Sequence, residues 1–334
     1  MSNREIVLPD SKIVYLVRKR RIWPWLLLGL GLGFFAAAAL LLDEENKPVS
    51  AWPRLNEAVV SGSGAAKIAL IRVGGIIRDE DESVGFKTRN VVSEFSAALR
   101  AAAADESVKA VILTVDSPGG GITASDVMYH RLLDFKKSGK PVVALLGDIA
   151  ASGGYYIAAP ADLIYAHPTS ITGSIGVIIQ SFNVESLMRK IGVEDVTIKA
   201  GEQKDMLSPF RQLTPGEYEE LQALVNGMHE RFIQVIVQNR GLPEEDVRAA
   251  ADGRIFDAEE AFQAGLVDEI GYLEDAIAAA EELAGIESST VVEYQPHFGV
   301  LSLLGASFPA PLAVRLLERL EAAATPRLMY LWRL

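Results

Sequence analysis

Short apolar runs alternate with helical stretches along the middle of the chain. From residue 67 the runs KIALIRVGG, KAVILTVDSPGGG and KPVVALLGD are separated by VVSEFSAALRAAAAD and TASDVMYHRLLDFKKSG, whose apolar residues follow a helical period. Strand, helix, strand, helix, strand is the pattern of crossover units around a mostly parallel, buried sheet. The pattern therefore predicts an α/β fold.

The second half of the sequence is predicted to be mostly helical. Short strands and one helix come first, in ADLIYAHP, GSIGVII, SFNVESLMRKIG (the helix) and VEDVTIKAG. A long helix then begins after Thr214, a suitable cap, with Pro215 in its first turn, and it ends at Gly241. Three shorter helices complete a helical C-terminal part, around PEEDVRAAA, DAEEAFQAG and LEDAIAAAEELAG.

One segment near the N-terminus is long and apolar enough to cross a membrane. Residues 22–42 carry no charge over 21 positions, and a helix of that length, at about 1.5 Å per residue, spans a hydrocarbon core of roughly 30 Å. The run continues straight into acidic residues at 43–45, without a cleavage site, so we expect an uncleaved anchor. Because a basic cluster at 18–21 precedes the run, the positive-inside rule predicts a cytoplasmic N-terminus and an exported remainder.

These patterns divide the chain into five parts. We expect a basic cytoplasmic segment at 1–21, a transmembrane helix at 22–42, a linker at 43–66, an α/β domain at 67–285 and a C-terminal extension at 286–334. The linker mixes charge, Pro, Ser and Gly without a sustained period. In the extension, PLAVRLLERLEAAA has a helical period, which fits either an interfacial amphipathic segment or a helix that completes a core or a subunit interface.

Composition and charge narrow the function classes. The chain has no cysteine, which rules out thiol catalysis, disulfides and cysteine zinc sites. Beyond residue 42 there are 26 basic and 42 acidic side chains, a net charge of −16. Such a surface is poorly suited to nucleic acid or to anionic lipid headgroups. We therefore expect no nucleic-acid partner, and attachment to the membrane through the N-terminal helix.

Two glycine-rich turns carry the candidate chemistry. DSPGGG at 116–121 follows the strand VILTV, and ASGGYY, which contains Ser152, follows the strand VVALLGD. Glycine turns before helices leave backbone N–H groups open to a ligand, and in a parallel sheet both turns lie at the same edge. Ser152 alone is either a close-packing spacer or a nucleophile, and its surroundings depart from the GxSxG pattern of α/β-hydrolases.

A serine nucleophile needs a base, and the sequence offers few candidates. The histidines His130, His167, His229 and His297 all stand outside glycine-rich or polar motifs, and His167 alone stays open as a base. Lysine is the other option, since burial among apolar groups lowers the pKa of an ammonium by several units. Lys204, in KAGEQKDMLSPF, follows a predicted strand and is flanked by Gly, Met, Leu and Pro.

Four motifs together resemble the signal peptide peptidase A family of membrane-anchored serine-lysine peptidases. They are DSPGGG, IAASGGYYIAAPAD, TGSIGVI and AGEQKDMLSPF, in the family's order within residues 67–285. The resemblance implies a crotonase-like and Clp-protease-like fold of repeated ββα units, which agrees with the crossover pattern. Each motif occurs once, as in the family's short form. Residues 67–285, which contain all four motifs, are therefore the expected peptidase domain.

The resemblance also implies a role for each matching residue. Ser152 corresponds to the nucleophile, and Lys204 to the general base that takes the serine proton. Ser174 corresponds to the residue that orients the lysine. Gly119 and Gly153 correspond to the positions whose N–H groups form the oxyanion hole. No metal and no cofactor is implied.

Partners follow from the same resemblance. In the family, the serine and the lysine of one site come from adjacent copies or subunits, so we expect a homo-oligomer in which Lys204 of one chain meets Ser152 of its neighbour. The implied substrates are remnant signal peptides, or other unfolded apolar peptides, cut on the outer side of the cytoplasmic membrane.

Three other functions stay open at this point. A related membrane serine peptidase, associated with stomatin-type partners, would share the chemistry and differ in partner and cleavage preference. A crotonase-like acyl-thioester enzyme would use the glycine turns for a thioester oxyanion and a carboxylate such as Asp148 as base. A membrane-tethered scaffold would keep the fold without turnover.

Overall fold

A computed structural model describes residues 55–84, 87–296 and 328–332 of the chain. The chain divides into two compact units, Met1–Ala51 and Trp52–Leu334, and the described residues all belong to the second. The anchor predicted at 22–42 and the helical segment predicted within 286–334 lie outside them. Within the described ranges, no helix combines the length and the apolar character needed to cross a membrane.

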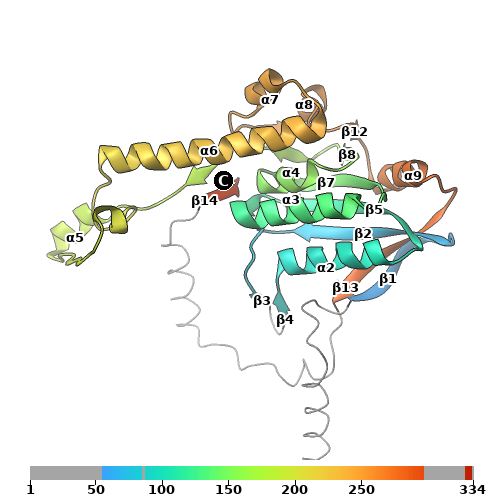
Figure 1. The fold of residues 1–334 in the computed structure, drawn as a ribbon, viewed down its shortest axis with the longest axis horizontal. Coiled ribbons are helices and arrows are strands. Elements are labelled where there is room, and N and C mark those ends of the chain that lie inside the picture. Colours follow the sequence, from blue (N-terminus) through green and yellow to red (C-terminus); the bar gives the residue numbers. More distant parts are fainter. Residues whose placement is uncertain (1–54, 85–86, 297–327, 333–334) are drawn as a thin grey trace, which may run out of the picture. The chain divides into compact units, whose positions relative to one another are not determined.

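A largely parallel sheet forms the centre of the described unit, which confirms the α/β prediction (Figure 1). Its strands run in the order β1-β13-β2-β5-β7-β8-β12, with β9 beside the end of β7 and β11 beside β9. Only the pairs β1·β13 and β9·β11 are antiparallel within this sheet. The strands are β1 (Leu55–Gly62), β2 (Ala66–Gly74), β5 (Val108–Ser117), β7 (Val142–Ala151), β8 (Leu163–Ala166), β9 (Ile171–Gly173), β11 (Ile255–Asp257), β12 (Glu269–Ile270) and β13 (Ser289–Pro296).

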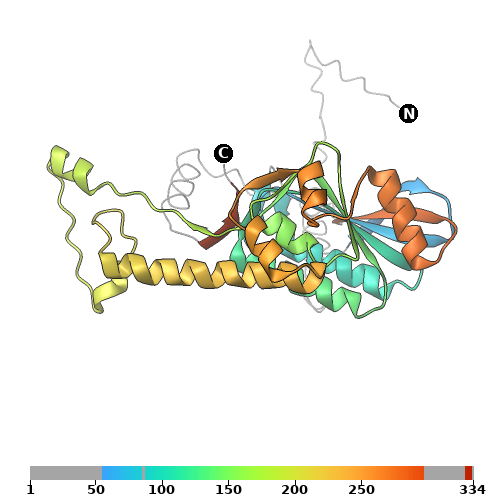
Figure 2. The same cartoon turned by 90° about the horizontal axis from the view of Figure 1, so that it is seen from above.

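Helices cover both faces of this sheet (Figures 1 and 2). Helices α2, α3 and α4 pack on one face and α9 on the other, and the remaining helices lie within residues 185–263 of the sequence. The helices are α2 (Val91–Ala104), α3 (Ile122–Lys136), α4 (Gly153–Ala158), α5 (Glu185–Ile191), the 3-10 helix η1 (Glu202–Asp205), α6 (Pro215–Arg240), α7 (Glu244–Ala250), α8 (Ala258–Gln263) and α9 (Leu273–Ala284).

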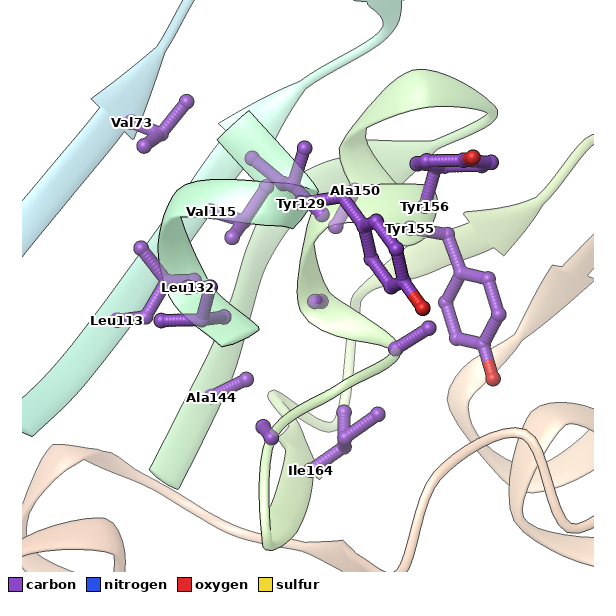
Figure 3. Packing of buried hydrophobic residues seen from close by; sticks show 14 of the residues in the cluster. Val73, Leu113, Val115, Tyr129, Leu132, Ala144, Ala150, Tyr155, Tyr156 and Ile164 are labelled. Atoms are coloured by element: carbon purple, nitrogen blue, oxygen red, sulfur yellow. The ribbon is translucent and has the colours of Figure 1, made fainter. Parts of the chain in front are cut away.

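Two hydrophobic cores follow from the alternation of side chains along the strands. On β2, Ala69, Ile71 and Val73 face the larger core, whereas Ile68 and Leu70 face the smaller core under α9. Figure 3 shows part of the larger core, in which aromatic side chains of α3 and α4 pack against strand residues. The serine motif of residues 150–156 therefore contributes to the larger core.

Two small sheets accompany the main one. A three-stranded sheet has the order β10-β14-β6, from β6 (Gly119–Gly121), β10 (Ile178–Ile179) and β14 (Leu328–Leu331). The strands β3 (Glu82–Val84) and β4 (Lys87–Arg89) form an antiparallel pair. The first of these sheets joins the DSPGGG turn to the end of the chain.

The long helix α6 has the ends that the sequence predicts. The Thr214 hydroxyl accepts a hydrogen bond from the Glu217 N–H at 3.3 Å, the Glu217 carboxylate accepts one from the Thr214 N–H at 2.9 Å, and Pro215 is the first helical residue. Gly241 ends the helix in the left-handed conformation, with φ 65°. The second half of α6 is anchored by buried apolar residues that include Phe232 and Ile236.

The structure differs from the sequence predictions in two places. The main sheet extends past 67–285, because β1 lies in the range assigned to the linker and β13 in the range assigned to the C-terminal extension. The strand predicted at VEDVTIKAG is wrong, since residues 193–200 form neither helix nor strand. Val196 and Ile198 are 82% and 96% exposed there, so the apolar alternation has no neighbouring strand in the described part of the chain.

Candidate active site

Ser152 stands at a sharp turn between strand β7 and helix α4. It is the N-cap residue of α4, it is 1% exposed, and its backbone has φ 53° and ψ −117°. A positive φ is strained for a residue with a side chain, and it persists only where the surroundings fix it. This strand-turn-helix arrangement is that of a nucleophile elbow, which presents a serine hydroxyl at the edge of a sheet. The AASGG sequence forms it without the GxSxG pattern.

Ser174 lies beside Ser152 because two parallel strands end together. Strands β7 and β9 pair at Ala151 and Gly173, and each serine is the next residue along its strand. The Ser152 N–H donates to the Gly173 carbonyl at 2.7 Å, and the Ser174 N–H donates to the Arg254 carbonyl at 2.7 Å. Ser174 also has a positive φ, 49°, and is 8% exposed. The structure thus brings together two of the predicted residues.

The glycines Gly119 and Gly153 also meet, across the two glycine-rich turns. A methyl group built on Gly119 would lie 2.6 Å from the Gly153 nitrogen, and Gly119 has φ 96°. Both the close approach and the conformation therefore require glycine at this position. As the first residue of α4, Gly153 has no acceptor for its N–H inside the helix. Its N–H, next to Ser152, is suited to stabilise an oxyanion.

The N–H of Gly119 has a different partner. It donates to the Ser117 hydroxyl at 3.1 Å, and that hydroxyl donates to the Gly75 carbonyl at 2.6 Å. In this conformation the Gly119 N–H is directed to its own turn, so its part in the oxyanion hole stays a prediction. Sequence reasoning missed Ser117, although it belongs to the DSPGGG motif.

Buried tyrosines hold α4 in place behind Ser152. The Tyr155 hydroxyl donates to the Leu266 carbonyl at 2.7 Å, and the Tyr156 hydroxyl donates to the Asp126 carboxylate at 2.6 Å. Burial raises the pKa of both hydroxyls well above the usual value, and the bond to Asp126 raises that of Tyr156 further. Both tyrosines therefore stay neutral donors at physiological pH, and the start of α4 is fixed at Ser152.

Lys204 lies in a separate and exposed region. The segment 180–214 connects β10 to α6, and we call it the arm; Lys204 belongs to its 3-10 helix η1 and is exposed. Figures 1 and 2 show the arm at the N-terminal end of α6, away from α4. The structure of one chain therefore does not bring Lys204 to Ser152.

Ion pairs connect the arm to the first turn of α6. Arg211 donates to the carboxylates of Asp205 and Glu217, at 2.7 and 2.8 Å, and Lys199 donates to Asp205 at 2.6 Å. Hydrogen bonds from Arg211 and then from the Thr214 backbone lower the pKa of Glu217 to about 2. Hydrogen bonds from Arg211 and Lys199 likewise hold the pKa of Asp205 well below its usual value. This network fixes η1 to the start of α6.

The sequence left His167 and Asp148 open as alternative bases and set His229 aside; the structure places the three in different surroundings. His167 follows β8 and hydrogen-bonds Thr169 at 2.9 Å. Ala166 pairs with Leu146 of β7, which lies five residues before Ala151. Measured along the strands, His167 is therefore roughly 16 Å away from Ser152. His229 lines a pocket of about 380 Å³ together with Ser174, and its Nε2 is buried without a hydrogen-bond partner in the described structure. Asp148 is exposed.

Two further features at the site were not found from the sequence. The Ser125 hydroxyl of α3 is buried without a hydrogen-bond partner among the described residues, and a methyl group on Gly153 would lie 2.5 Å from it. The strand β14 pairs with Gly119–Gly121, and its Tyr330 carbonyl oxygen would lie 2.1 Å from a methyl group on Gly119. Nothing in a three-glycine strand or in MYLWRL signals this pairing.

Comparison with known proteins identifies the family. The chain matches the model described as Peptidase family S49 over residues 134–287, which include Ser152, Ser174 and Lys204. It is 38% identical over 240 residues to a protein of Enterococcus faecium assigned as signal peptide peptidase SppA, covering 72% of this chain and 70% of that protein.

Two further relatives are also assigned as proteases. A protein of Methanocaldococcus jannaschii assigned as a protease is 42% identical over 190 residues, covering 57% of this chain and 61% of that protein. Protease 4 of Salmonella typhi is 35% identical over 256 residues, covering 76% of this chain and 41% of that protein. With the elbow serine, its neighbouring glycines and these matches, the chain belongs to peptidase family S49 and is a serine peptidase.

Proposed function

We propose that the chain is a membrane-anchored endopeptidase that cleaves remnant signal peptides and other unfolded apolar peptides with a Ser152/Lys204 dyad. The observation that carries the proposal is the strained, buried elbow at Ser152, with the Gly153 N–H next to it and Ser174 beside it. The relative of Enterococcus faecium assigned as signal peptide peptidase SppA supports the substrate class. The uncharged run at 22–42 supports the anchor, with the catalytic unit on the outer side.

In the proposed reaction, Ser152 Oγ attacks the scissile carbonyl carbon while Lys204 Nζ takes the hydroxyl proton. The oxyanion that forms lies against the Gly153 N–H and a donor of the glycine strand. The C–N bond breaks, the amine leaves with the proton from Lys204, and water then hydrolyses the acyl-enzyme with Lys204 again as base. Ser174 orients the lysine.

We propose that Lys204 reaches the Ser152 of a neighbouring chain in a homo-oligomer. Two properties of the arm support this. The arm, whose 3-10 helix η1 contains Lys204, lies at the N-terminal end of α6 and away from α4 of its own chain (Figure 1). The arm also exposes apolar side chains that a monomer would leave in water. The exposed apolar residues of the arm are Phe182, Leu187, Ile191, Val193, Val196, Ile198 and Phe210. A second copy that covers them would desolvate the lysine and favour its neutral form.

Mixing two inactive variants tests the shared site. Ser152→Ala and Lys204→Ala chains are each expected to be inactive on an unfolded apolar peptide. If they are dissociated, mixed in equal amounts and reassembled, about a quarter of the sites in a head-to-tail ring would combine an intact serine with an intact lysine. Recovery of about a quarter of the parent activity supports the proposal. No recovery, with mixed oligomers formed, places both groups of one site in the same chain and contradicts it.

A histidine variant tests the competing base within the same chain. His229 lines the pocket that Ser174 lines, so a serine-histidine pair is the chemical alternative. His229→Gln is expected to lower activity less than about tenfold, whereas loss of an essential base costs several powers of ten. A loss as large as that of Ser152→Ala would assign the base to His229. A stomatin-associated peptidase would give the same results and differ in its partner and its cleavage preference.

A further inference from the structure

We propose that His229 is a positioning residue for the lysine of the dyad, because its Nε2 accepts a hydrogen bond from Nζ of the Lys204 that a neighbouring chain brings to Ser174. The inference rests on the proposed function, in which Lys204 of one chain serves Ser152 of the next. It deepens that function in two ways. It adds a residue that the dyad does not contain, and it places this residue on the chain that carries the serine.

A pocket of about 380 Å³ extends from Ser174 along helix α6. Its walls come from residues 174–178 after β9, residues 251–253 before β11, one face of α6, and Leu331. The α6 residues are spaced by three and four positions and therefore share a face of the helix; they are Gln222, Val225, Asn226 and His229. Since this face runs from His229 towards the first residue of α6, the pocket offers a long side chain a path that ends at Ser174.

The Nε2 atom of His229 is an unsatisfied polar group of this pocket. It is buried and has no hydrogen-bond partner within the ranges that the structure describes. Two other polar groups of the pocket do have one. The Asn226 side-chain oxygen accepts from the Gln222 amide at 2.8 Å, and the Asp252 carboxylate accepts from the Arg254 N–H at 2.9 Å. A buried nitrogen without a partner costs free energy, and an amine N–H satisfies it when the imidazole proton is on Nδ1.

The backbone of His229 is held in place by the packing of α6. Phe232, Val235 and Ile236, which follow within two turns, are fully buried in the larger core. The carbonyl of the preceding residue, Met228, accepts a hydrogen bond from the Tyr330 hydroxyl at 2.8 Å. The imidazole is therefore carried by a rigid part of the helix, as a group that orients another side chain must be.

Two acceptors are what a neutral lysine needs to become a directed base. A neutral amine has two N–H bonds and one lone pair, and the lone pair must face the proton that it takes. If the Ser174 hydroxyl accepts one N–H and His229 Nε2 the other, the lone pair is left for the Ser152 hydroxyl. A carboxylate in place of the imidazole would favour the charged ammonium instead. The carboxylate that does line the pocket, Asp252, is paired with Arg254 at 3.5 Å.

Apolar walls complete the surroundings of the incoming amine. Ile175, Ala251 and Leu331 line the same pocket and are buried. Contact with such groups removes water from the amine and favours its neutral form. The pocket thus supplies, on the chain that carries the serine, the apolar contacts that Lys204 lacks on its own chain.

Mixed oligomers test on which chain His229 acts. The reference is the reassembled mixture of Ser152→Ala and Lys204→Ala chains, in which every working site takes its serine from the Lys204→Ala chain. Adding His229→Leu to that chain puts the change into the working sites, and activity should fall about tenfold or more below the reference. Adding His229→Leu to the Ser152→Ala chain puts it into sites that already lack the nucleophile, and activity should stay at the reference. Equal activity in all three mixtures, or the same loss in both altered mixtures, would overturn the inference.

Kinetics of the single variants test the hydrogen bond itself. His229→Leu is expected to lower kcat about tenfold or more with little change in KM, because the base is misdirected while peptide binding is kept. His229→Gln, whose side-chain oxygen can accept the same bond, should stay within about threefold of the parent. His130→Leu, at a histidine of α3 whose side chain is 65% exposed, is the control and should change neither constant. A His229→Gln enzyme as slow as His229→Leu would contradict an accepted hydrogen bond.

The same experiments separate this inference from the proposed function. If the reference mixture recovers no activity although mixed oligomers form, the shared site fails and the role of His229 fails with it. If the reference mixture recovers activity and His229→Leu changes neither the mixtures nor kcat, the shared site stands and only the role of His229 is wrong.

Discussion

The two halves of the proposed dyad lie in regions of opposite character. Ser152 stands at the end of a buried parallel strand, behind which two tyrosines fix α4 from within the chain. Lys204 stands in the arm, where ion pairs near the surface fix the backbone and apolar side chains are left exposed. The surroundings of Ser152 are complete in a single chain, whereas those of Lys204 lack the apolar groups that a neutral lysine needs.

This difference separates folding from catalysis. A chain can position Ser152, the Gly153 N–H and Ser174 alone, because they depend on packing inside one unit. In the proposed function, Lys204 would become a base only when a neighbouring chain covers the arm. On that proposal, an isolated chain would be folded but inactive.

The largest expected effect comes from changing Lys204 while keeping its charge. Lys204→Arg retains a cation, but a guanidinium stays protonated and cannot act as a base. We expect kcat to fall by about 10³ or more, with the free energy of unfolding unchanged. Lys190→Arg, an exposed lysine of α5 in the same arm, is the matched control and should keep full activity. An active Lys204→Arg enzyme would remove the lysine from the mechanism.

A smaller effect is expected from the glycine that joins the two turns. Gly119→Ala places a methyl group 2.6 Å from the Gly153 nitrogen, so the turns must separate, and activity should fall by about 10². Gly139→Ala is the control, because Gly139 also has a positive φ, 77°, but has no atom within 4 Å of the added methyl group. It should cost about 1 kcal/mol of stability from backbone strain and leave kcat/KM intact. Equal losses in both variants would assign the effect to strain alone.

A third effect tests whether the arm is covered in the assembled enzyme. Ile198→Asp puts a charge at a side chain that is 96% exposed in one chain. If a neighbour covers it, the variant should dissociate in sedimentation experiments and lose about tenfold or more in activity. Leu283→Asp, on α9 at a side chain that is 44% exposed, should leave the mass of the assembly unchanged. An Ile198→Asp chain that assembles and cleaves normally would show that the arm stays in water.

The smallest expected effect is a difference in acid sensitivity between the arm and the region around Ser152. The Glu217 carboxyl has a pKa lowered from 4.5 to about 2, so its stabilising contribution is present above about pH 4.5 and is lost as the pH falls towards 2. Amide exchange at η1 and the start of α6 should speed up over this range, while exchange in β7 and α4 should stay slow. The Glu217→Gln chain should show fast exchange at the arm already at pH 6. Uniform loss of protection across the unit would contradict a separate arm.

The success of sequence prediction follows the same division. The buried strands, the capped helix from Pro215 to Arg240 and the meeting of two glycine turns at one sheet edge all follow from local patterns. These patterns work where the partners of a segment lie in the same chain. The strand predicted at VEDVTIKAG is wrong because its apolar alternation has no such partner.

Other features escaped prediction for a related reason. The pairing of β14 with Gly119–Gly121 uses main-chain groups, which leave no trace in the side-chain pattern. The strand β1 escaped because its residues, LNEAVVSG, are mostly exposed and carry little apolar period. The strain at Ser152 and Ser174 likewise depends on the packing around them, and a serine in a sequence does not reveal its backbone angles.

The unbroken length of α6 has a geometric consequence. Its buried contact at Phe232 and its first residue, Pro215, are 17 residues apart, which corresponds to roughly 25 Å of helix. In the proposed homo-oligomer, the number of residues in α6 would therefore set how far each chain extends towards the next. Adding or removing one turn, about 5.4 Å, would change the spacing between successive subunits without altering any residue of the proposed catalytic centre.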